Sequence, residues 1–250
     1  MIVSRLLAVL LALCVATVAA FGDTYIVPVW SKNVPSSEGA WTAQIVAQNL
    51  SDQPVEYRVT DAFPLSTAPC PLCEGTKSWK TIPPGATVEV TPGDALVREQ
   101  MTIGAFVVET NGPLVFDAIA YRASLPEFRQ HLDVARRWLT PGAHSITTVA
   151  RGGPAWRINA FVVNPNSAEI IVHLWIGPRD ENQVSVLVPP HTTRLITLRP
   201  PICNGLPCTQ PDEYPPSRAV INVESQSTNL VGISSIDVGW AIFSLPGTAK

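Results

Sequence analysis

The sequence predicts an all-β protein made of two tandem β-sandwich domains. The 250-residue chain contains 24 prolines and short alternating apolar runs rich in Val, Ile and Thr, a composition typical of strands separated by turns. A pattern that begins at a tryptophan and reaches an asparagine eight residues later occurs at Trp41 and Asn49, and again 115 residues further on at Trp156 and Asn164. This repeat predicts that one module has been duplicated.

The first twenty residues are typical of a secretory signal peptide. Arg5 is followed by an apolar run and by the small residues Ala19 and Ala20, so we expect cleavage after Ala20. A lipoprotein leader would carry its lipid on Cys14, but Leu13 stands where such a leader needs a small residue. No later stretch reaches the roughly 18 apolar residues of a membrane-spanning helix. We therefore expect the remaining chain to be secreted, periplasmic or at the cell surface, and not to span a membrane.

Charge is spread evenly along the exported part of the chain. Of the 17 basic and 20 acidic residues only Arg5 falls in the leader, which leaves a net charge of −4 without blocks of like charge. Nucleic-acid binding needs clustered Lys and Arg, so the sequence argues against a nucleic-acid partner.

Each copy begins with two strands of alternating pattern joined by a polar turn. The turns, residues 49–52 and 164–167, start with an asparagine, whose side chain can bond its own backbone and favour a tight reversal. One face of each strand is apolar, which predicts burial of that face. The predicted inward residues are Trp41, Ala43, Ile45, Ala47, Val55, Tyr57 and Val59 in the first copy, and Trp156, Ile158, Ala160, Val162, Ile170, Val172 and Leu174 in the second.

The later elements recur as well. A segment with a Pro-Pro turn, residues 82–90, matches residues 188–196, and strands near 105–109 and 114–118 match 219–223 and 230–234. Several short strands with proline-bounded turns, roughly 8 to 12 residues apart, predict an immunoglobulin-like β-sandwich in each copy. True immunoglobulin domains also need a Cys-Trp-Cys core spacing, which the chain lacks. The expected domains are residues 21–125 and 145–250.

Residues 126–144 form the expected connector. Ser124 to Glu127 has the form of a capping box, and Phe128, Leu132, Ala135 and Leu139 keep a helical period, which predicts a short connecting helix. Periodicity alone is ambiguous over so short a segment. The alternative, in which residues 130–134 continue the sheet, stays equally open.

The four cysteines of the exported part, Cys70, Cys73, Cys203 and Cys208, are expected to form disulfides. They allow three connectivities, of which two local bridges, 70 to 73 and 203 to 208, are the simplest. Crossed pairs and metal or redox roles stay open. A redox Cys-x-x-Cys lies at a helix N-terminus, whereas prolines and a glycine place Cys70 and Cys73 in a loop.

The sequence carries no motif for catalysis, a metal or a cofactor. Gly-x-Ser-x-Gly and glycine-rich phosphate loops are missing, and the four histidines never fall at metal-ligand spacing. We therefore predict no catalytic residue, no metal and no cofactor, although a triad assembled from distant residues would leave no motif. Asn49-Leu50-Ser51 has the form of a glycosylation sequon, but a turn at the end of a strand explains this asparagine better.

The outward positions differ between the two copies. They are mostly polar in the first copy and apolar in the second, and a contiguous apolar patch usually marks a contact site. Either the connector covers this patch within the chain, through Leu132, Trp138 or Leu139, or another molecule binds there. If the two strands pair as a hairpin, the side chains are neighbours across the ladder. The candidate contact residues are Phe161, Val163, Ile171, His173 and Trp175.

Several short motifs lie along the chain. They are Tyr25-Ile26-Val27-Pro28, Gly39-Ala40-Trp41, Asn49, Pro83-Pro84-Gly85 and Gly112-Pro113-Leu114-Val115 in the first copy, and Trp156-Arg157-Ile158-Asn159 and Val163-Asn164-Pro165-Asn166 in the second. These motifs resemble those of secreted bacterial proteins built from tandem immunoglobulin-like modules. The resemblance covers nearly all of the exported chain and implies a pair of β-sandwiches, but it supplies no catalytic residue. The cysteine insertions depart from it.

The function expected from the sequence is that of a non-catalytic exported protein with a structural, adhesive or protein-binding role. A polysaccharide partner is the alternative, bound through exposed tryptophans such as Trp79, Trp138 or Trp175. A hydrolase in the groove between the domains would need two carboxyl groups, or a Ser and a His, within hydrogen-bond reach. A pilus-type periplasmic chaperone fits less well, because its two domains are unlike each other.

Overall fold

The structure of the chain is a computed structural model. The described residues are all-β, as predicted: they form eighteen strands, and none of them is α-helical. Among them, no helix is both long and apolar enough to cross a membrane. The expected leader, Trp156 and Cys70, Cys73 and Cys208 lie outside the described residues, and of Cys203 only the backbone is described. The structure describes residues 22–35, 40–66, 78–92, 103–122, 125–132, 134–136, 138, 142–148, 158–176, 183–198, 202–203, 206–207, 219–225, 231–237 and 240–243.

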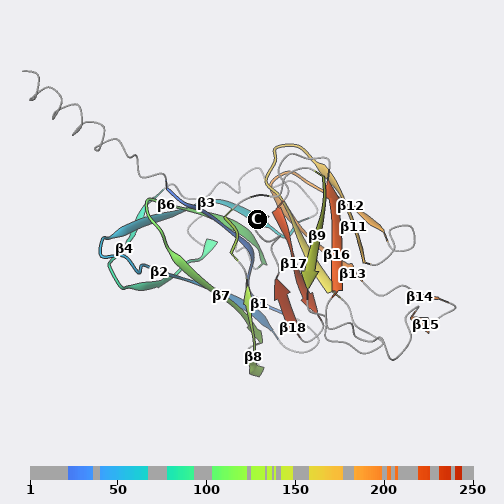
Figure 1. Cartoon of the computed structure of the whole chain (residues 1–250), viewed down its shortest axis with the longest axis horizontal. Coiled ribbons are helices and arrows are strands. Elements are labelled where there is room, and N and C mark those ends of the chain that lie inside the picture. The colour runs from blue at the N-terminus through green and yellow to red at the C-terminus, as the bar shows by residue number, and fades with distance from the viewer. Residues whose placement is uncertain are drawn as a thin grey trace, which may run out of the picture.

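The strands divide into two groups that follow each other along the chain (Figure 1). The first group consists of β1 (Thr24–Val34), β2 (Trp41–Gln48), β3 (Val55–Pro64), β4 (Lys80–Ile82), β5 (Thr87–Glu89), β6 (Ile103–Thr110), β7 (Val115–Arg122) and β8 (Leu125–Leu132). The second consists of β9 (Gly142–Thr148), β10 (Ile158–Asn164), β11 (Ile170–Ile176), β12 (Val184–Val188), β13 (Thr192–Leu198), β14 (Ile202–Cys203), β15 (Leu206–Pro207), β16 (Ala219–Ser225), β17 (Val231–Asp237) and β18 (Trp240–Phe243).

With one exception, the strand pairings follow the same order in both groups. In the first group β2 lies between β5 and β7, β7 pairs with β8, and β3 lies between β4 and β6, which also pairs with β1. In the second group β10 lies between β13 and β17, β17 pairs with β18, and β11 lies between β12 and β16, which also pairs with β9. All these pairings are antiparallel. In the first group β1 also pairs with β2, which joins the two sets of strands into one continuous sheet, and no described pairing of the second group corresponds to it. In the second group the two sets are separate layers, so the consecutive strands β10 and β11 lie in different layers.

The cores follow from the alternation in the sequence. Ala43, Ile45 and Ala47 of β2 are buried, as are Val55, Tyr57 and Val59 of β3, and these side chains meet others from β1, β6 and β7 in one cluster. In the second group Ala160, Val162, Ile170, Val172 and Leu174 are buried, which confirms the predicted inward positions that the structure describes. Burial of these apolar side chains is the main term that stabilises such a fold.

The two groups share one continuous set of buried contacts. A single parallel bridge, Phe243 to Leu132, joins β18 to β8, so that twelve strands belong to one sheet. At a second point Thr193 of β13 bridges Leu65, and the Thr193 hydroxyl donates a 2.7 Å hydrogen bond to the carbonyl oxygen of Phe63. Thr193 is fully buried. The halves of the chain are thus packed against each other through both backbone and side chains.

The connector is a strand as far as Leu132, so the helix predicted over this part is wrong, and the alternative in which residues 130–134 continue the sheet is confirmed up to Leu132. β8 spans Leu125–Leu132 and pairs with β7, for example Tyr121 with Arg129. The register shifts between Arg122 and Tyr121, and this bulge accommodates Pro126, which cannot donate to a ladder. The edge of β7 offers backbone hydrogen bonds to this segment, and these outweigh the weak helical period of a few apolar residues. Further on, Ala135 exchanges two backbone hydrogen bonds with Ile26 of β1, of 2.7 and 3.0 Å.

A buried asparagine fixes the turn that follows β2 and the turn that follows β10. In the first, the Asn49 amide nitrogen donates to the carbonyl oxygens of Gln53 (2.7 Å) and Ile82 (3.0 Å), while its oxygen accepts from the backbone nitrogen of Ser51 (2.9 Å). Asn49 is fully buried. Its side chain therefore ties the turn to the Pro-Pro segment and cannot serve as a glycosylation acceptor in the folded protein.

Candidate functional site

The five candidate contact residues divide between two layers. β10 and β11 do not pair as a hairpin, so Phe161 and Val163 are not cross-strand neighbours of the β11 residues. Phe161 belongs to the same core cluster as Leu132, and Val163 packs in a second cluster that Trp138 joins. Both side chains are almost completely buried. β10 is buried on both of its faces, because the first half of the chain and the connector cover the face that alternation alone assigns to solvent.

The three β11 residues lie on the outer face of the layer formed by β12, β11, β16 and β9. Ile171 is 55% exposed, and Leu187 of β12, directly opposite it in the ladder, is 48% exposed. His173 and Trp175 follow on the same face of β11 and are partly exposed. Exposed apolar side chains are ordinary when single, but two in direct cross-strand register form the start of a patch. We call Ile171, His173, Trp175 and Leu187 the β11–β12 face.

His173 is the polar centre of the β11–β12 face. Its Nδ1 lies 2.8 Å from the hydroxyl oxygen of Ser185, its cross-strand neighbour on β12, and 3.2 Å from the amide nitrogen of Gln183. An amide nitrogen only donates, so with this amide orientation Nδ1 accepts and the ring proton of neutral His173 resides on Nε2. On the other side, Glu224 of β16 is the cross-strand partner of His173. Ser185, His173 and Glu224 thus form a row across three strands.

The first half carries a different set at the corresponding register positions. Arg58 of β3 pairs with Glu109 of β6, as His173 pairs with Glu224. The Arg58 guanidinium donates to one Glu109 carboxylate oxygen from Nη2 (2.6 Å) and Nε (2.9 Å), and its Cζ lies 4.6 Å from the centre of the Trp79 ring. This arrangement covers the sheet with charged groups. In the second half Glu224 corresponds to Glu109, but His173 stands in place of Arg58, and aliphatic side chains lie beside it.

The candidate tryptophans of a sugar site are not equivalent. Trp138 packs edge-on against Phe63, with ring centres 6.0 Å apart, within a mostly buried cluster. Trp79 is 43% exposed, but Arg58 lies over its ring. Trp175 lies on the β11–β12 face. A stacking platform for a sugar needs an accessible ring face, which Trp138 does not offer, and Trp175 is partly exposed.

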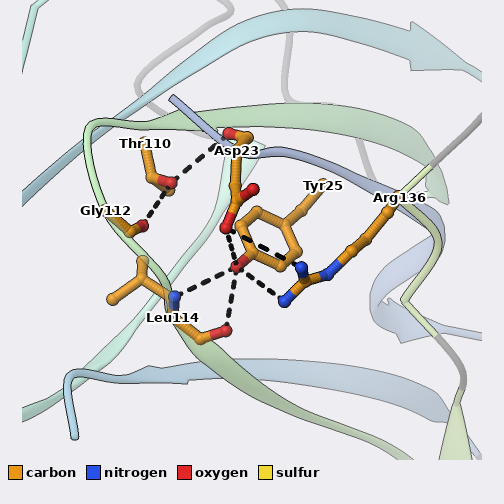
Figure 2. Close-up of polar contacts among 6 residues, drawn as sticks. All are labelled: Asp23, Tyr25, Thr110, Gly112, Leu114 and Arg136. Carbon is orange, nitrogen blue, oxygen red and sulfur yellow. Dashed lines mark hydrogen bonds and ion pairs between the residues drawn. The ribbon is translucent and has the colours of Figure 1, made fainter. Parts of the chain in front are cut away.

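A second polar cluster, centred on Tyr25, was not predicted from the sequence (Figure 2). The Tyr25 hydroxyl accepts a 3.0 Å hydrogen bond from the backbone nitrogen of Leu114, and its proton is shared between the carbonyl oxygen of Leu114 (3.0 Å) and Oδ2 of Asp23 (3.2 Å). Arg136 donates to the same hydroxyl (3.3 Å), forms an ion pair with Asp23 and lies over the tyrosine ring. Burial raises the pKa of Tyr25 above its ordinary value of 10.0.

The Tyr25 cluster has a structural role. It joins the start of β1, the loop before β7 and the segment after β8, three parts of the chain that are distant in sequence. Its hydroxyl is satisfied by backbone groups, which is typical of a tyrosine that fixes the packing of strands. The sequence does not indicate this role of Tyr25, because Leu114 and Arg136 lie 89 and 111 residues further along the chain.

Within the described residues, no group of three or more His, Cys, Asp or Glu side chains could hold a metal ion. Comparison with known protein families, with curated proteins and with solved structures found no match for this chain. The candidate site therefore rests on the geometry of the β11–β12 face alone.

Proposed function

We propose that the chain is a non-catalytic exported protein of the cell envelope or the extracellular space that binds another protein through the β11–β12 face. The observation that carries this proposal is the pair of exposed aliphatic side chains, Ile171 and Leu187, in direct cross-strand register beside a histidine and a tryptophan. Protein contact sites have apolar centres enriched in aromatic residues and depleted of charge. The matching surface of the first half, with its Arg58–Glu109 ion pair, lacks this character.

We also infer that the two halves are copies of one immunoglobulin-like sandwich module. The shared order of strand pairings and the buried asparagine at the end of β2 and of β10 support this inference. Each position of the β11–β12 face has a matched position in the first half, with the same strand register but different surface side chains. A variant at the matched position is therefore the control for a variant on the β11–β12 face.

A photo-crosslinking experiment tests the contact proposal. A benzophenone amino acid is placed at Ile171, or at Glu56, which is exposed at the corresponding position of β3. The variants are expressed in the producing cells, and we expect a protein adduct from position 171 that is missing from position 56. The isolated partner should then bind purified chain about tenfold more weakly after Ile171→Asp than after Glu56→Lys, a difference of about 1.4 kcal/mol. Equal adducts at both positions would show that the β11–β12 face is not a specific contact.

The Ser185–His173 contact favours a hydrolase as the second candidate function. A serine whose hydroxyl lies 2.8 Å from a histidine acceptor can be activated as a nucleophile, and Glu224 in the same row could orient the imidazole. This row lies on the layer turned away from the first half, and not in a groove between the halves. The arrangement is exposed to water, where electrostatic stabilisation of an oxyanion is weak, so binding remains the better proposal.

A fluorophosphonate probe distinguishes the two functions. A hydrolase would be labelled at Ser185, and Ser185→Ala or His173→Ala would abolish labelling, whereas Ser167→Ala in a nearby turn would not. A binding protein is not labelled at any serine above the level of the unfolded chain. Labelling of Ser185 that depends on His173 would support a hydrolase and contradict the proposal that the chain is non-catalytic.

A further inference from the structure

β12 ends the four-stranded sheet, and its own residues provide none of the usual protection against pairing. Its sequence is Val184-Ser185-Val186-Leu187-Val188, which contains neither charge nor proline. It pairs with β11 on one side, and within the described part of the chain no strand pairs with its other side. An edge strand presents a row of backbone groups that can pair with another strand, and proteins normally block such edges with charges, prolines or bulges.

The edges formed by β4 and β13 are protected. β4, which corresponds to β12 in the order of pairing, has only three residues and begins with Lys80. β13 ends the twelve-stranded sheet, but Leu65 bridges to it and Ser66 donates a backbone hydrogen bond to Thr193 (3.1 Å). The edge strand β12 of the second half is therefore longer than β4, its counterpart in the first half, and it lacks the charge that Lys80 gives to β4.

β12 is complementary to a second copy of itself. In an antiparallel pair centred on Val186, Val184 faces Val188 of the other copy and Ser185 faces Leu187 of the other copy. Val184 and Leu187 are the exposed apolar side chains of this strand, and both would lose exposed surface in the pair. A twofold contact requires a patch that matches itself, and an uncharged strand places no like charges opposite each other. An unrelated partner strand would need no such symmetry.

We propose that β12 pairs antiparallel with β12 of a second copy of this chain, so that two four-stranded layers become one sheet of eight strands. The twofold axis between antiparallel strands is perpendicular to the sheet, so the outer faces of both copies lie on the same side. The Ile171 and Leu187 side chains of the two copies then form one longer patch. The pairing does not rest on the proposed function, since the dimer forms whether or not that patch binds a partner.

Sedimentation of the chain without residues 1–20, over a wide concentration range, tests the proposal. We expect a species of twice the monomer mass that dissociates on dilution. The double variant Ser185→Lys, Leu187→Lys adds charge to the outer side of the edge and should weaken the dimer about tenfold or more, because each lysine then faces a lysine of the other copy. The matched control is Thr81→Lys on β4, an exposed position that corresponds to Leu187, and it should leave the dimer unchanged.

Hydrogen exchange locates the contact within the dimer. Backbone amides of residues 184–188 should be protected at high concentration and lose protection on dilution, while amides of β4 should not change. A wild-type chain that stays monomeric at every concentration would overturn the proposal. So would a dimer that resists the lysines but is lost with Ile171→Asp, since the contact would then be the outer face and not the edge. Far-ultraviolet circular dichroism shows whether each variant is folded before its mass is compared.

Discussion

Asn49 and Asn164 make the same hydrogen bonds at the same place in the two halves of the chain. Each amide nitrogen donates to the carbonyl oxygen four residues on, at 2.7 Å in the first half and 2.8 Å in the second. Each also donates to the carbonyl oxygen that precedes a Pro-Pro pair, at 3.0 and 2.9 Å, and each amide oxygen accepts from the backbone nitrogen two residues on. Both side chains are fully buried. One polar side chain thus satisfies the backbone of two turns at once.

Replacement of either asparagine should therefore destabilise the protein strongly. We expect Asn49→Ala and Asn164→Ala each to lower the free energy of unfolding by about 2 to 4 kcal/mol, because buried carbonyl and amide groups lose their partners. Asn49→Asp should not restore stability, since a carboxylate cannot donate to the two carbonyl oxygens. Urea unfolding followed by circular dichroism measures these changes. The matched control is Leu50→Ala in the same turn, which is exposed and should change stability by no more than about 0.5 kcal/mol. Equal effects of Asn49→Ala and Leu50→Ala would show that the buried bonds contribute nothing.

The two Pro-Pro turns place different residues in the left-handed region of the backbone. Gly85 has a φ of 71°, and His191, at the corresponding place, has a φ of 51°. A β-carbon added at Gly85 would meet no atom within 4 Å, so Gly85→Ala changes only the backbone preference. We expect a loss of about 1 kcal/mol in the free energy of unfolding, the usual cost of the left-handed region for a residue with a β-carbon. Gly85→Asn should cost less, because asparagine adopts this region more readily than alanine. Identical stability of the wild type and Gly85→Ala in urea would contradict this reading of the turn.

The sequence predicts the strands better than it predicts their neighbours. Alternation correctly assigned the inward residues of β2, β3 and β11, because a period of two depends only on which face is covered. It could not show that β10 and β11 lie in different layers, and it therefore grouped Phe161 and Val163 with Ile171. Their burial against Leu132 and in the cluster that Trp138 joins agrees with the alternative in which the connector covers the patch, but for these two residues alone. Ser185 was missed as a partner of His173, since only the register of β11 and β12 brings them together.

Tyr25 should make stability depend on pH in the alkaline range. Burial raises the pKa of its hydroxyl above 10.0. Above pH 10 the unfolded phenol loses its proton while the folded one keeps it, so the folded state binds more protons and the free energy of unfolding falls as pH rises. The stabilising contribution is complete below the unfolded pKa of about 10 and is lost as pH rises through the folded pKa. Burial also raises the pKa of Tyr57, which acts in the same direction.

Tyr25→Phe separates the hydrogen bonds of this hydroxyl from its titration. At neutral pH the variant should lose about 1 to 3 kcal/mol, because the buried Leu114 backbone groups and Arg136 lose their partner. As pH rises above 10 the difference between wild type and variant should shrink, since only the wild type carries the titrating group. Urea unfolding at a series of pH values between neutral and alkaline measures both effects. A difference that stays constant over the whole series would mean that the folded and unfolded hydroxyls titrate alike.

Thr193 should couple the stability of the two halves. Its hydroxyl donates to the Phe63 carbonyl oxygen across the contact between β13 and the end of β3, and the side chain is fully buried. Thr193→Val keeps the shape but removes the donor, and we expect the free energy of unfolding to fall by about 1 to 3 kcal/mol. If the halves unfold as one unit, hydrogen exchange should accelerate by the same factor in β1 and in β10, although the substitution lies in neither strand. Leu195→Thr, at an exposed position of the same strand, is the control and should leave both strands unaffected. Faster exchange confined to the second half would show that the shared contacts do not couple the two sets of strands, in spite of the buried bond that joins them.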